Sequence, residues 1–463
     1  MASTYAYRTM DLTADGGYTS RFVFSAWVKR SKLGYANAPL FSLHKNNSNT
    51  ASKINFNFNS SDQLSFTMQD SGGSEDSEYQ TNRKFRDTSA WYHIYFAFNS
   101  TLSTAADRLQ IYVNGVRETS FAQANEVSNG FGALMSSSMD FRIGTMKNNS
   151  GTAYYFDGLM NSAIFTNYQS GTVDPVTDFG EVDSTTGEWK INTSPDVTYA
   201  SQGVFVLKNG NSLTDQSGQS NNMTVGGTLT NSLDCPSNVF ATWNSLDQYY
   251  FWGAAASTNI TNGNTTVQSG NSQYSYIPTT LGASSGKYYW EIKPSARNGG
   301  TDDLLVGVTS TQAVSTAQTL GWHPNDVAYR EDGNKKINNS DTSYGNSYTL
   351  NDIIGVAMDL DNNKLYFSKN GVWQNSGDPT SGSTGTGAIP LTASASTGLG
   401  NYFASVAYVN GSYNATFQAN FGNGFFGTSA VADNSTATAS TPGTFNYDVP
   451  AGYQPLTTKG LNA

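Results

Sequence analysis

The chain of 463 residues has a single cysteine, Cys235, so no intrachain disulfide can form. The fold must therefore be stabilised by a buried core. Cys235 precedes Pro236 in a neutral stretch, and we interpret it as an inert residue. Charged residues are also scarce: they make up 13% of the chain, against a usual share of roughly 25%.

The chain has no excess of positive charge. Its formal net charge is −10 and its pI is about 4.8, and no run of lysine and arginine occurs. Nucleic-acid binding depends on cations that neutralise phosphates, so this composition predicts no nucleic-acid partner. An anionic membrane surface would repel the protein for the same reason.

Long apolar runs are missing as well. No stretch approaches the roughly 18 apolar residues of a membrane-spanning helix. The first residues show no charged segment followed by an apolar run, so we expect no signal peptide. These features predict a soluble protein that is made in the cytoplasm and does not insert into a membrane.

Aromatic residues and glycine are abundant. The chain has 27 Tyr, 25 Phe and 45 Gly, and apolar and polar residues alternate in many short segments. Alternation with a period of two is typical of half-buried strands, so we predict an all-β fold. The expected strands are residues 21–29, 53–58, 63–68, 91–98, 140–144, 154–160, 288–292, 304–308 and 353–358.

One short pattern occurs twice. An apolar strand is followed by Asn114-Gly115 and a second apolar start, and the same pattern surrounds Asn370-Gly371. Asn-Gly tolerates the positive φ angles of a type I′ turn, so each pattern predicts a tight β-hairpin. The two hairpins are too far apart in sequence for one small sheet, which predicts two β-sandwiches in tandem.

The first half resembles the laminin-G-like, concanavalin A-like jelly roll. The matching segments occur in the family's order: FSAWVK at 24–29, WYHI at 91–94, IYVNG at 111–115, FDGL at 156–159 and LTDQSG at 213–218. The resemblance implies a jelly roll over residues 1–232. Asp157 stands where some members of that family bind calcium, although Asn161 replaces the acidic residue that follows it.

The second half resembles a SPRY domain. The matching segments are GKYYWE at 286–291, LGW at 320–322, GVAMDL at 355–360 and LYFSKNGVW at 365–373. The resemblance implies a sandwich over residues 233–427, and residues 428–463 would be a low-complexity loop and a C-terminal segment that packs back on this domain. Loops form the ligand surface in SPRY domains. Trp322, His323 and Tyr329 are the candidate ligand-binding residues because aromatic faces suit sugar or peptide contacts.

Two flanking segments resemble bacteriophage virion proteins. They are DCPSNVFATWN at 234–244 and the ending that includes Phe445-Asn446-Tyr447. The resemblance implies a non-enzymatic protein on the virion surface, such as a tail-associated adhesin that recognises a host-surface glycan or protein. Its other partners would be virion structural proteins, and a homo-oligomer stays open. The alternative is a decoration protein on the capsid.

Catalytic chemistry is poorly represented. A glycoside hydrolase needs two carboxylates across the sugar bond, and the nearest pattern contains Glu181 and Asp183 in a loop-like stretch. The acidic residues Glu75, Asp76 and Glu78 form a weak candidate cation site. The segment that starts at Asp359 lacks the glycine and glutamate of a calcium loop, so we predict neither a metal nor a catalytic centre.

Overall fold

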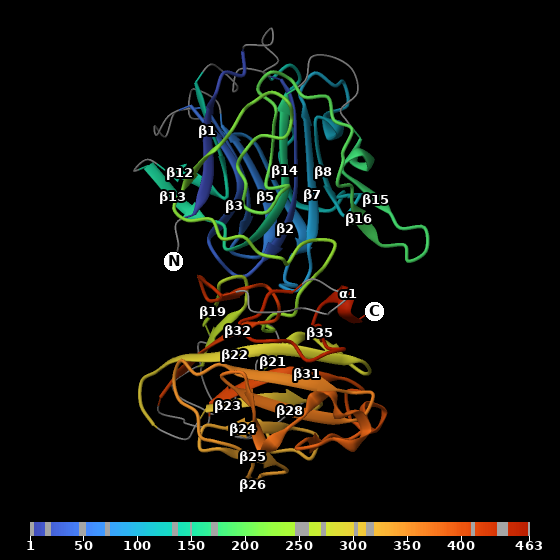
Figure 1. Cartoon of the computed structure of the whole chain (residues 1–463). Coiled ribbons are helices and arrows are strands. Elements are labelled where there is room, and N and C mark those ends of the chain that lie inside the picture. Colours follow the sequence, from blue (N-terminus) through green and yellow to red (C-terminus); the bar gives the residue numbers. More distant parts are fainter. Residues whose placement is uncertain are drawn as a thin grey trace. The chain divides into compact units, whose positions relative to one another are not determined.

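The computed structural model describes residues 4–13, 20–45, 52–69, 75–131, 138–148, 151–167, 175–245, 259–269, 275–300, 304–311, 319–408, 413–432 and 443–461. Nearly every element among these residues is a strand (Figure 1). The chain divides into two compact units, Met1–Asn231 and Ser232–Ala463, and each contains two large, mainly antiparallel sheets around a core. The predicted all-β class with antiparallel sandwiches is confirmed.

The first unit has a sheet of eight strands and a sheet of six. The larger sheet has the order β10 (Phe121–Ala124), β6 (Glu75–Lys84), β5 (Gln63–Gln69), β4 (Lys53–Asn59), β3 (Asn37–His44), β11 (Met139–Ile143), β1 (Tyr5–Met10), β18 (Thr224–Gly226). The smaller sheet has the order β17 (Val204–Val206), β14 (Gly158–Asn167), β2 (Arg21–Arg30), β7 (Tyr92–Asn99), β8 (Leu109–Val113), β9 (Val116–Arg117).

The core of the first unit is built from aromatic side chains. They come from every second residue of the strands and point inward from both sheets. The ring centroids of Phe22 and Phe96 lie 5.5 Å apart, and those of Phe24 and Phe41 lie 4.4 Å apart. All four side chains are fully buried. Burial of this apolar area provides the stability that a chain without disulfides needs.

Two small hairpins lie outside the main sheets of the first unit. They are β12 (Thr145–Asn148) with β13 (Gly151–Tyr155), and β15 (Gly180–Val182) with β16 (Trp189–Ile191). The prediction of one strand over residues 154–160 is wrong, because the chain leaves β13 after Tyr155 and starts β14 at Gly158. The backbone N–H of Phe156 donates to the Gly144 carbonyl, and the N–H of Ser31 donates to the Asp157 carbonyl.

The outer face of the six-stranded sheet is covered by later parts of the chain. Val23, Tyr95 and Ile164 point outward from this sheet and form a buried cluster with Phe179 and Phe205. Phe179 follows the short helix η2 (Val176–Asp178), which leads into the β15–β16 hairpin. This face of the first unit is therefore an inner layer and is closed to large ligands.

The second unit also has two main sheets. One has the order β19 (Asn259–Thr261), β20 (Thr266–Gln268), β32 (Ala415–Asn420), β22 (Lys287–Arg297), β27 (Ile354–Asp359), β28 (Lys364–Lys369), β29 (Val372–Trp373), with β30 (Ile389–Pro390) on β28 and β35 (Gln454–Pro455) on β22. The other has the order β21 (Ser275–Ala283), β31 (Tyr402–Tyr408), β23 (Leu304–Thr309), β24 (Val327–Arg330), β25 (Asn334–Ile337), β26 (Ser340–Ser343). Its remaining elements are β33 (Phe425–Phe426), β34 (Ser429–Ala430), η3 (Gln374–Ser376), η4 (Pro379–Thr384), η5 (Ser394–Ser396) and α1 (Thr458–Leu461), and the first unit also contains η1 (Ala105–Asp107).

The start and the end of the second unit are joined by hydrogen bonds. The N–H of Ala241 donates to the Leu456 carbonyl at 2.9 Å, and the N–H of Val239 donates to the Thr458 hydroxyl at 3.0 Å. Phe445 and Tyr453 pack against Tyr289 on the outer face of the sheet that contains β22. The described C-terminal residues are thus part of the fold of this unit.

Both predicted Asn-Gly hairpins are present. Asn114 and Gly115 connect β8 to β9 with φ angles of 49° and 76°. Asn370 and Gly371 connect β28 to β29 with φ angles of 49° and 81°. These positive values are those of a type I′ turn, so the prediction from the Asn-Gly pairs is confirmed.

Candidate functional site

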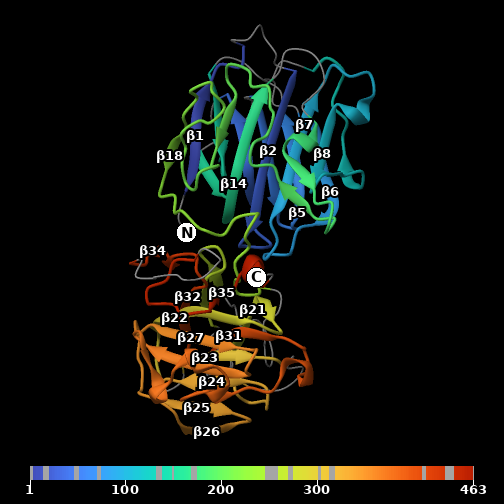
Figure 2. The same cartoon turned by 45° about the vertical axis from the view of Figure 1, so that its right-hand side comes forward.

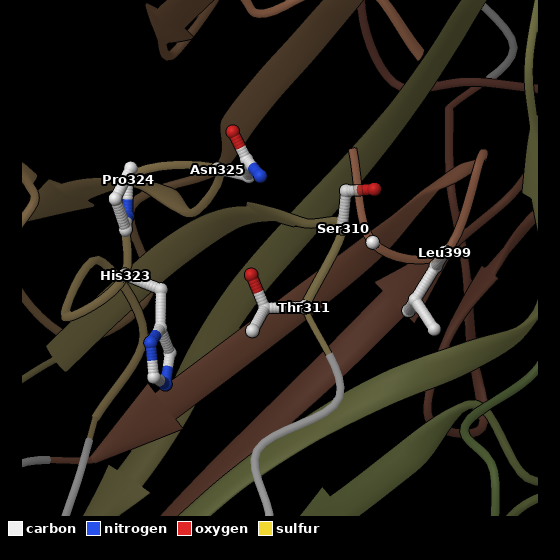
Figure 3. A pocket seen from close by; sticks show the side chains of 7 residues that line it. Ser310, Thr311, His323, Pro324, Asn325 and Leu399 are labelled. Atoms are coloured by element: carbon white, nitrogen blue, oxygen red, sulfur yellow. The ribbon is translucent and has the colours of Figure 1, made fainter. Parts of the chain in front are cut away.

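A pocket of about 320 Å³ opens among the loops of the second unit (Figure 3). In Figure 3, Ser310 and Thr311 lie between the turn that carries His323 and the loop that carries Leu399. These three segments precede or follow β23, β24 and β31, which are neighbours in one sheet. The lining residues are Ser310, Thr311, His323, Pro324, Asn325, Gly398 and Leu399.

The turn before β24 places an aromatic side chain at the surface, next in sequence to a residue that lines the pocket. Gly321 has a φ of +84°, and a Cβ at this position would lie 2.6 Å from the Lys336 carbonyl oxygen. Glycine therefore allows the turn to approach β25, and the N–H of Asn339, in the turn after β25, donates to the Gly321 carbonyl at 2.8 Å. Trp322 follows this glycine and is 38% exposed.

His323 lines the pocket. Its side chain is half-buried, and its Nε2 atom is buried with no hydrogen-bond partner among the described residues. Burial lowers the pKa of the imidazole below its ordinary value, which favours the neutral ring at pH 7. A neutral imidazole can donate at one nitrogen and accept at the other, so His323 suits an uncharged polar ligand group.

Asp326 is fully buried just after the pocket-lining turn. The Thr309 hydroxyl donates to its Oδ1 at 2.8 Å, while Oδ2 has no hydrogen-bond partner within the described part of the chain. Burial raises the pKa of this carboxyl to about 6, against the hydrogen bonds that lower it. The Ser310 hydroxyl donates to the Asn401 carbonyl at 2.6 Å, which connects β23 to the loop before β31. These hydrogen bonds thus fix the ends of the pocket-lining loops where they join β23 and β31.

The structure separates the three predicted ligand-binding residues. Trp322 and His323 lie side by side in the turn, one exposed and one in the pocket wall. Tyr329 lies in β24 and not in a loop, which corrects the expected position. Its ring is fully buried between Tyr344, Tyr348 and Phe367, because β24 alternates and directs this position into the core. Tyr329 has no access to a ligand there.

Four pocket residues carried no signal in the sequence. Ser310, Thr311, Asn325 and Leu399 are of residue types common on any loop, and they come from segments up to 89 positions apart (310 to 399). They meet only because β23, β24 and β31 pair in one sheet. Of the segments around the pocket, the sequence indicated only the turn that begins with the LGW motif at 320–322.

The weak metal candidates remain without ligand clusters. Asp157 lies between β13 and β14, and burial raises the pKa of its carboxyl. Within the described residues no group of three histidine, cysteine or acidic side chains converges. Glu78 accepts from Gln80 at 2.7 Å, while the side chains of Glu75 and Asp76 lie outside the described ones.

Two other acidic or sulfur-bearing side chains have structural partners. Asp359 is buried and forms an ion pair with Lys287 at 3.0 Å, and its carboxylate accepts from the N–H of Asn362. Cys235 is half-buried, with its Sγ 3.4 Å from the Ser237 hydroxyl.

The carboxylates considered for glycoside hydrolysis lie on an exposed hairpin. Glu181 is in β15, and Asp183 accepts from the N–H groups of Thr185 and Thr186 in the turn that follows. Lys190 lies 2.7 Å from Asp183 and holds the pKa of its carboxyl well below its ordinary range. A general acid needs a raised pKa, so Asp183 is unsuited to that role.

A buried histidine–serine pair occurs in the first unit. Nε2 of His93 lies 2.8 Å from the Ser25 hydroxyl, and the Trp189 indole N–H donates to Nδ1 of His93 at 3.1 Å. Since Nδ1 accepts, the proton resides on Nε2, which donates to Ser25. Burial lowers the pKa of His93 to about 3. In this tautomer the imidazole cannot accept the Ser25 proton, so the pair is not an activated nucleophile.

Comparison with known families assigns both units. Residues 3–168 match the concanavalin A-like lectin/glucanases superfamily, and residues 287–423 match the SPRY domain. The chain carries a concanavalin A-like domain followed by a SPRY domain. The loop pocket therefore belongs to the SPRY domain, and the His93 pair belongs to the concanavalin A-like domain. No helix among the described residues is long and apolar enough to cross a membrane.

Individual relatives cover only part of the chain. Ran-binding protein 9 of Danio rerio is 32% identical over 91 residues, which is 19% of this chain and 15% of that protein. The ATP-dependent RNA helicase DDX1 of Xenopus laevis is 33% identical over 93 residues, or 20% and 12% of the two chains. The solved SPRY domain of human HERC1 shares 16% identity, with a TM-score of 0.29 over 38% of this chain and 96% of that one.

Proposed function

We propose that this chain is a non-enzymatic binding protein of a bacteriophage virion surface, and that the loop pocket of its SPRY domain receives a host-surface glycan or protein. The pocket carries the proposal. It combines neutral hydrogen-bonding groups with the apolar side chain of Leu399, and the exposed Trp322 directly precedes the pocket-lining His323 in the chain. A concave surface with a few polar groups and apolar walls is the usual form of a ligand site.

The virion assignment is supported by the segments that flank the SPRY domain. The N-terminal phage-like segment contains Phe240, which forms an isolated bridge with Thr457 near the C-terminus. The ending contributes Asn446 and Tyr447, whose N–H groups donate to the buried Glu291. Both segments are therefore integral to the fold of this unit, and their resemblance to phage virion proteins is what supports the assignment.

The non-enzymatic part is supported by the chemistry of the groups described above. Asp183 is an ion-paired surface carboxylate, and His93 donates to Ser25. Neither arrangement supplies the general acid that hydrolysis of a glycan requires.

The proposal is tested by measuring attachment of the purified full chain to host cells. Trp322→Ala and His323→Ala should each weaken attachment about tenfold, as expected for central aromatic or polar contacts, with unchanged melting temperature. Val372→Ala is the matched control, because Val372 is exposed at the start of β29 and is not among the residues that line the pocket. Attachment that neither pocket variant changes would contradict the pocket assignment.

The location and the absence of catalysis need separate measurements. Imaging of particles with this protein labelled should show the label at the tail; a label over the capsid would make it a decoration protein instead. Release of reducing ends from host polysaccharide, abolished by Glu181→Gln or Asp183→Asn, would contradict the non-enzymatic role.

A further inference from the structure

The strand β18 forms one edge of the eight-stranded sheet of the concanavalin A-like domain (Figure 2). It pairs with β1 on one side, and among the described residues no strand lies on its other side. In an antiparallel ladder, the N–H and C=O groups of successive residues point to opposite sides of a strand. Whichever residues of β18 bond to β1, the residues next to them therefore direct their main-chain groups away from the sheet.

The rest of the fold leaves these outward main-chain groups unused. Met223, just before β18, donates its N–H to the Leu213 carbonyl at 3.0 Å, and the Thr228 carbonyl accepts from the Thr4 hydroxyl at 2.9 Å. Between these two positions, the described part of the chain provides no hydrogen-bond partner outside β1 for the main chain of residues 224–227. This edge can therefore bond to a further strand.

Two other strand edges of the same domain are protected. At the opposite edge of the sheet, the pairing of β10 shifts register between Phe121 and Gln123, and such a bulge disturbs further pairing. At the edge of the six-stranded sheet, the Phe205 N–H of β17 donates to the Asp215 side chain and its carbonyl accepts from the Gln216 N–H, both at 2.8 Å. β18 has neither protection, and it contains no proline and no charged residue.

An apolar pocket of about 390 Å³ lies at this edge. Val225 of β18 lines it, is 44% exposed and lies opposite Ala6, a residue of the core, so it is on the core-facing side of the sheet. Met223 of the lining belongs to the core, and Leu213 and Leu229 pack against it. The other lining residues among those described are the uncharged Asn211, Gly227 and Thr228. An apolar side chain placed in this pocket would extend the core of the sandwich.

We propose that β18 is a docking edge for an extended peptide segment of another protein. The segment adds a strand to the eight-stranded sheet by bonding to the main chain of residues 224–227, and it inserts an apolar side chain into the pocket beside Val225. In strand addition, main-chain hydrogen bonds provide affinity, and pockets for alternate side chains provide specificity. The open main-chain edge requires an extended peptide, and the uncharged pocket lining favours an apolar residue over a charged one.

Self-pairing of two copies explains these features less well. β18 has only three residues, so pairing with itself would form few hydrogen bonds and bury too little for the roughly 1,000 Å² of a stable interface. A longer partner segment can continue past β18 along residues 227–229, which line the pocket. This surface shares no residue with the SPRY pocket, so the proposal goes beyond the proposed function and does not rest on it.

The test measures binding of fluorescent decapeptides to the full chain by fluorescence anisotropy. The peptides alternate threonine with one apolar residue (valine, leucine, isoleucine or phenylalanine). One control peptide has aspartate in place of the apolar residues, and another has the best sequence with every main-chain nitrogen methylated. We expect each control to bind at least about tenfold more weakly than the best apolar peptide, because it lacks the apolar side chains or the main-chain donors.

A matched pair of variants locates the binding edge. Val225→Lys should weaken binding of the best peptide at least about tenfold, because lysine on an edge strand opposes the addition of another strand. Val116→Lys is the control, since Val116 is 65% exposed on β9 of the other sheet and is not among the residues that line this pocket. Equal melting temperatures of the two variants exclude misfolding. In the unchanged chain, the peptide should slow hydrogen exchange at residues 224–227 and leave β10 unaffected.

The outcomes separate this edge from other modes of binding. Weaker binding in Val225→Lys alone, with slower exchange at residues 224–227, supports the docking edge. Equal binding of the methylated peptide would show a pocket without strand addition and overturn the proposal. A dimer of the full chain that dissociates in Val225→Lys would assign the edge to a second copy and also overturn it, as would the absence of binding to every peptide. Loss of peptide binding in Trp322→Ala, with normal binding in Val225→Lys, would place the peptide at the SPRY pocket and contradict this proposal alone.

Discussion

Glu291 illustrates how one buried side chain holds a distant segment. It lies in β22 with no exposed surface, and its carboxylate accepts four hydrogen bonds. Oε1 receives the Tyr289 hydroxyl and the Tyr447 N–H, and Oε2 receives the Asn420 amide and the Asn446 N–H. Burial raises the pKa of Glu291 to about 7, although these hydrogen bonds lower it.

Replacement of this carboxylate is predicted to loosen the SPRY domain. In Glu291→Gln, the side-chain NH₂ replaces one carboxylate oxygen and faces two of the four groups that donate to it. These buried polar groups are then left without an acceptor. We expect a loss of about 2–3 kcal/mol of unfolding free energy, measured by urea denaturation. Glu181→Gln is the control, because Glu181 is exposed and should change stability by less than about 0.5 kcal/mol. An equal effect of both variants would contradict the role of Glu291.

The sequence placed Glu291 in a strand and could not indicate its partners. Asn420 lies 129 positions away and Tyr447 lies 156 positions away. Alternation predicts which face a residue occupies, but whether that face meets solvent or a later segment depends on long-range packing. The same reason explains Tyr329, whose aromatic character suited a ligand site and whose strand position directs it into the core.

At the scale of elements, the two Asn-Gly hairpins share more than a turn type. The Asn114 N–H donates to the His93 carbonyl, and the His93 N–H donates to the Asn114 side-chain oxygen at 2.8 Å. Asn370 makes the same pair of hydrogen bonds with Ile353, again at 2.8 Å. In each domain the turn asparagine thus extends the pairing with the neighbouring strand.

The glycines of both turns also make the same kind of contact. A Cβ on Gly115 would lie 2.5 Å from the Trp189 ring, and a Cβ on Gly371 would lie 2.7 Å from the Tyr447 ring. In each domain, therefore, an aromatic ring from a later segment packs on the bare turn glycine. The sequence predicted the turns from local preferences, but these covering rings come from segments whose position only the fold defines.

The asparagines differ in one contact, which gives a matched prediction. The Asn370 amide donates to Asp352 at 2.7 Å, whereas Asn114 makes no corresponding contact with an acidic side chain in the part of the chain that the structure describes. Asn370→Asp would place a second carboxylate against Asp352 and should lower the free energy of unfolding by about 1–2 kcal/mol. Asn114→Asp keeps the side-chain oxygen that accepts from His93, so its free energy of unfolding should change by less than about 0.5 kcal/mol. Thermal unfolding measures both, and equal shifts would show that the Asp352 contact is unimportant.

A glycine variant of each turn separates backbone strain from the hydrogen bond. Asn114→Gly and Asn370→Gly keep the positive φ but lose the side-chain acceptor, so each should lose about 1 kcal/mol. If neither variant changes the free energy of unfolding, the asparagines contribute only the positive φ angle of the turn.

At the scale of the whole molecule, the carboxyl and imidazole groups with the largest pKa shifts should make the two domains respond to pH in opposite directions. Burial lowers the pKa of His93 to about 3 and that of His44 to about 4. The unfolded chain binds these protons more tightly, so their contribution to the concanavalin A-like domain is present above pH 6.5 and is lost as the pH falls. Glu291 and Asp326 have raised pKa values of about 7 and about 6, so stability of the SPRY domain is lost as the pH rises through this range.

Scanning calorimetry of the full chain between pH 5 and 8 checks this prediction. We expect one transition to move down in temperature as the pH falls and the other to move down as it rises, with each group contributing on the order of 2–3 kcal/mol at most. Glu291→Gln should flatten the pH dependence of the SPRY transition, and His44→Gln that of the other. Two transitions that move in parallel would contradict the opposite signs.

Local chemistry alone determined the all-β class, most strand positions, both Asn-Gly turns and the absence of disulfides, because alternation and turn preferences act between near neighbours in sequence. The tertiary structure decided what each strand face meets. It buried Tyr329, covered the six-stranded sheet with Phe179 and brought Ser310, His323 and Leu399 to one pocket. Tyr5 and Tyr7 of β1 likewise meet Arg142 of β11, because strands far apart in sequence become hydrogen-bonded neighbours only when the sheet forms.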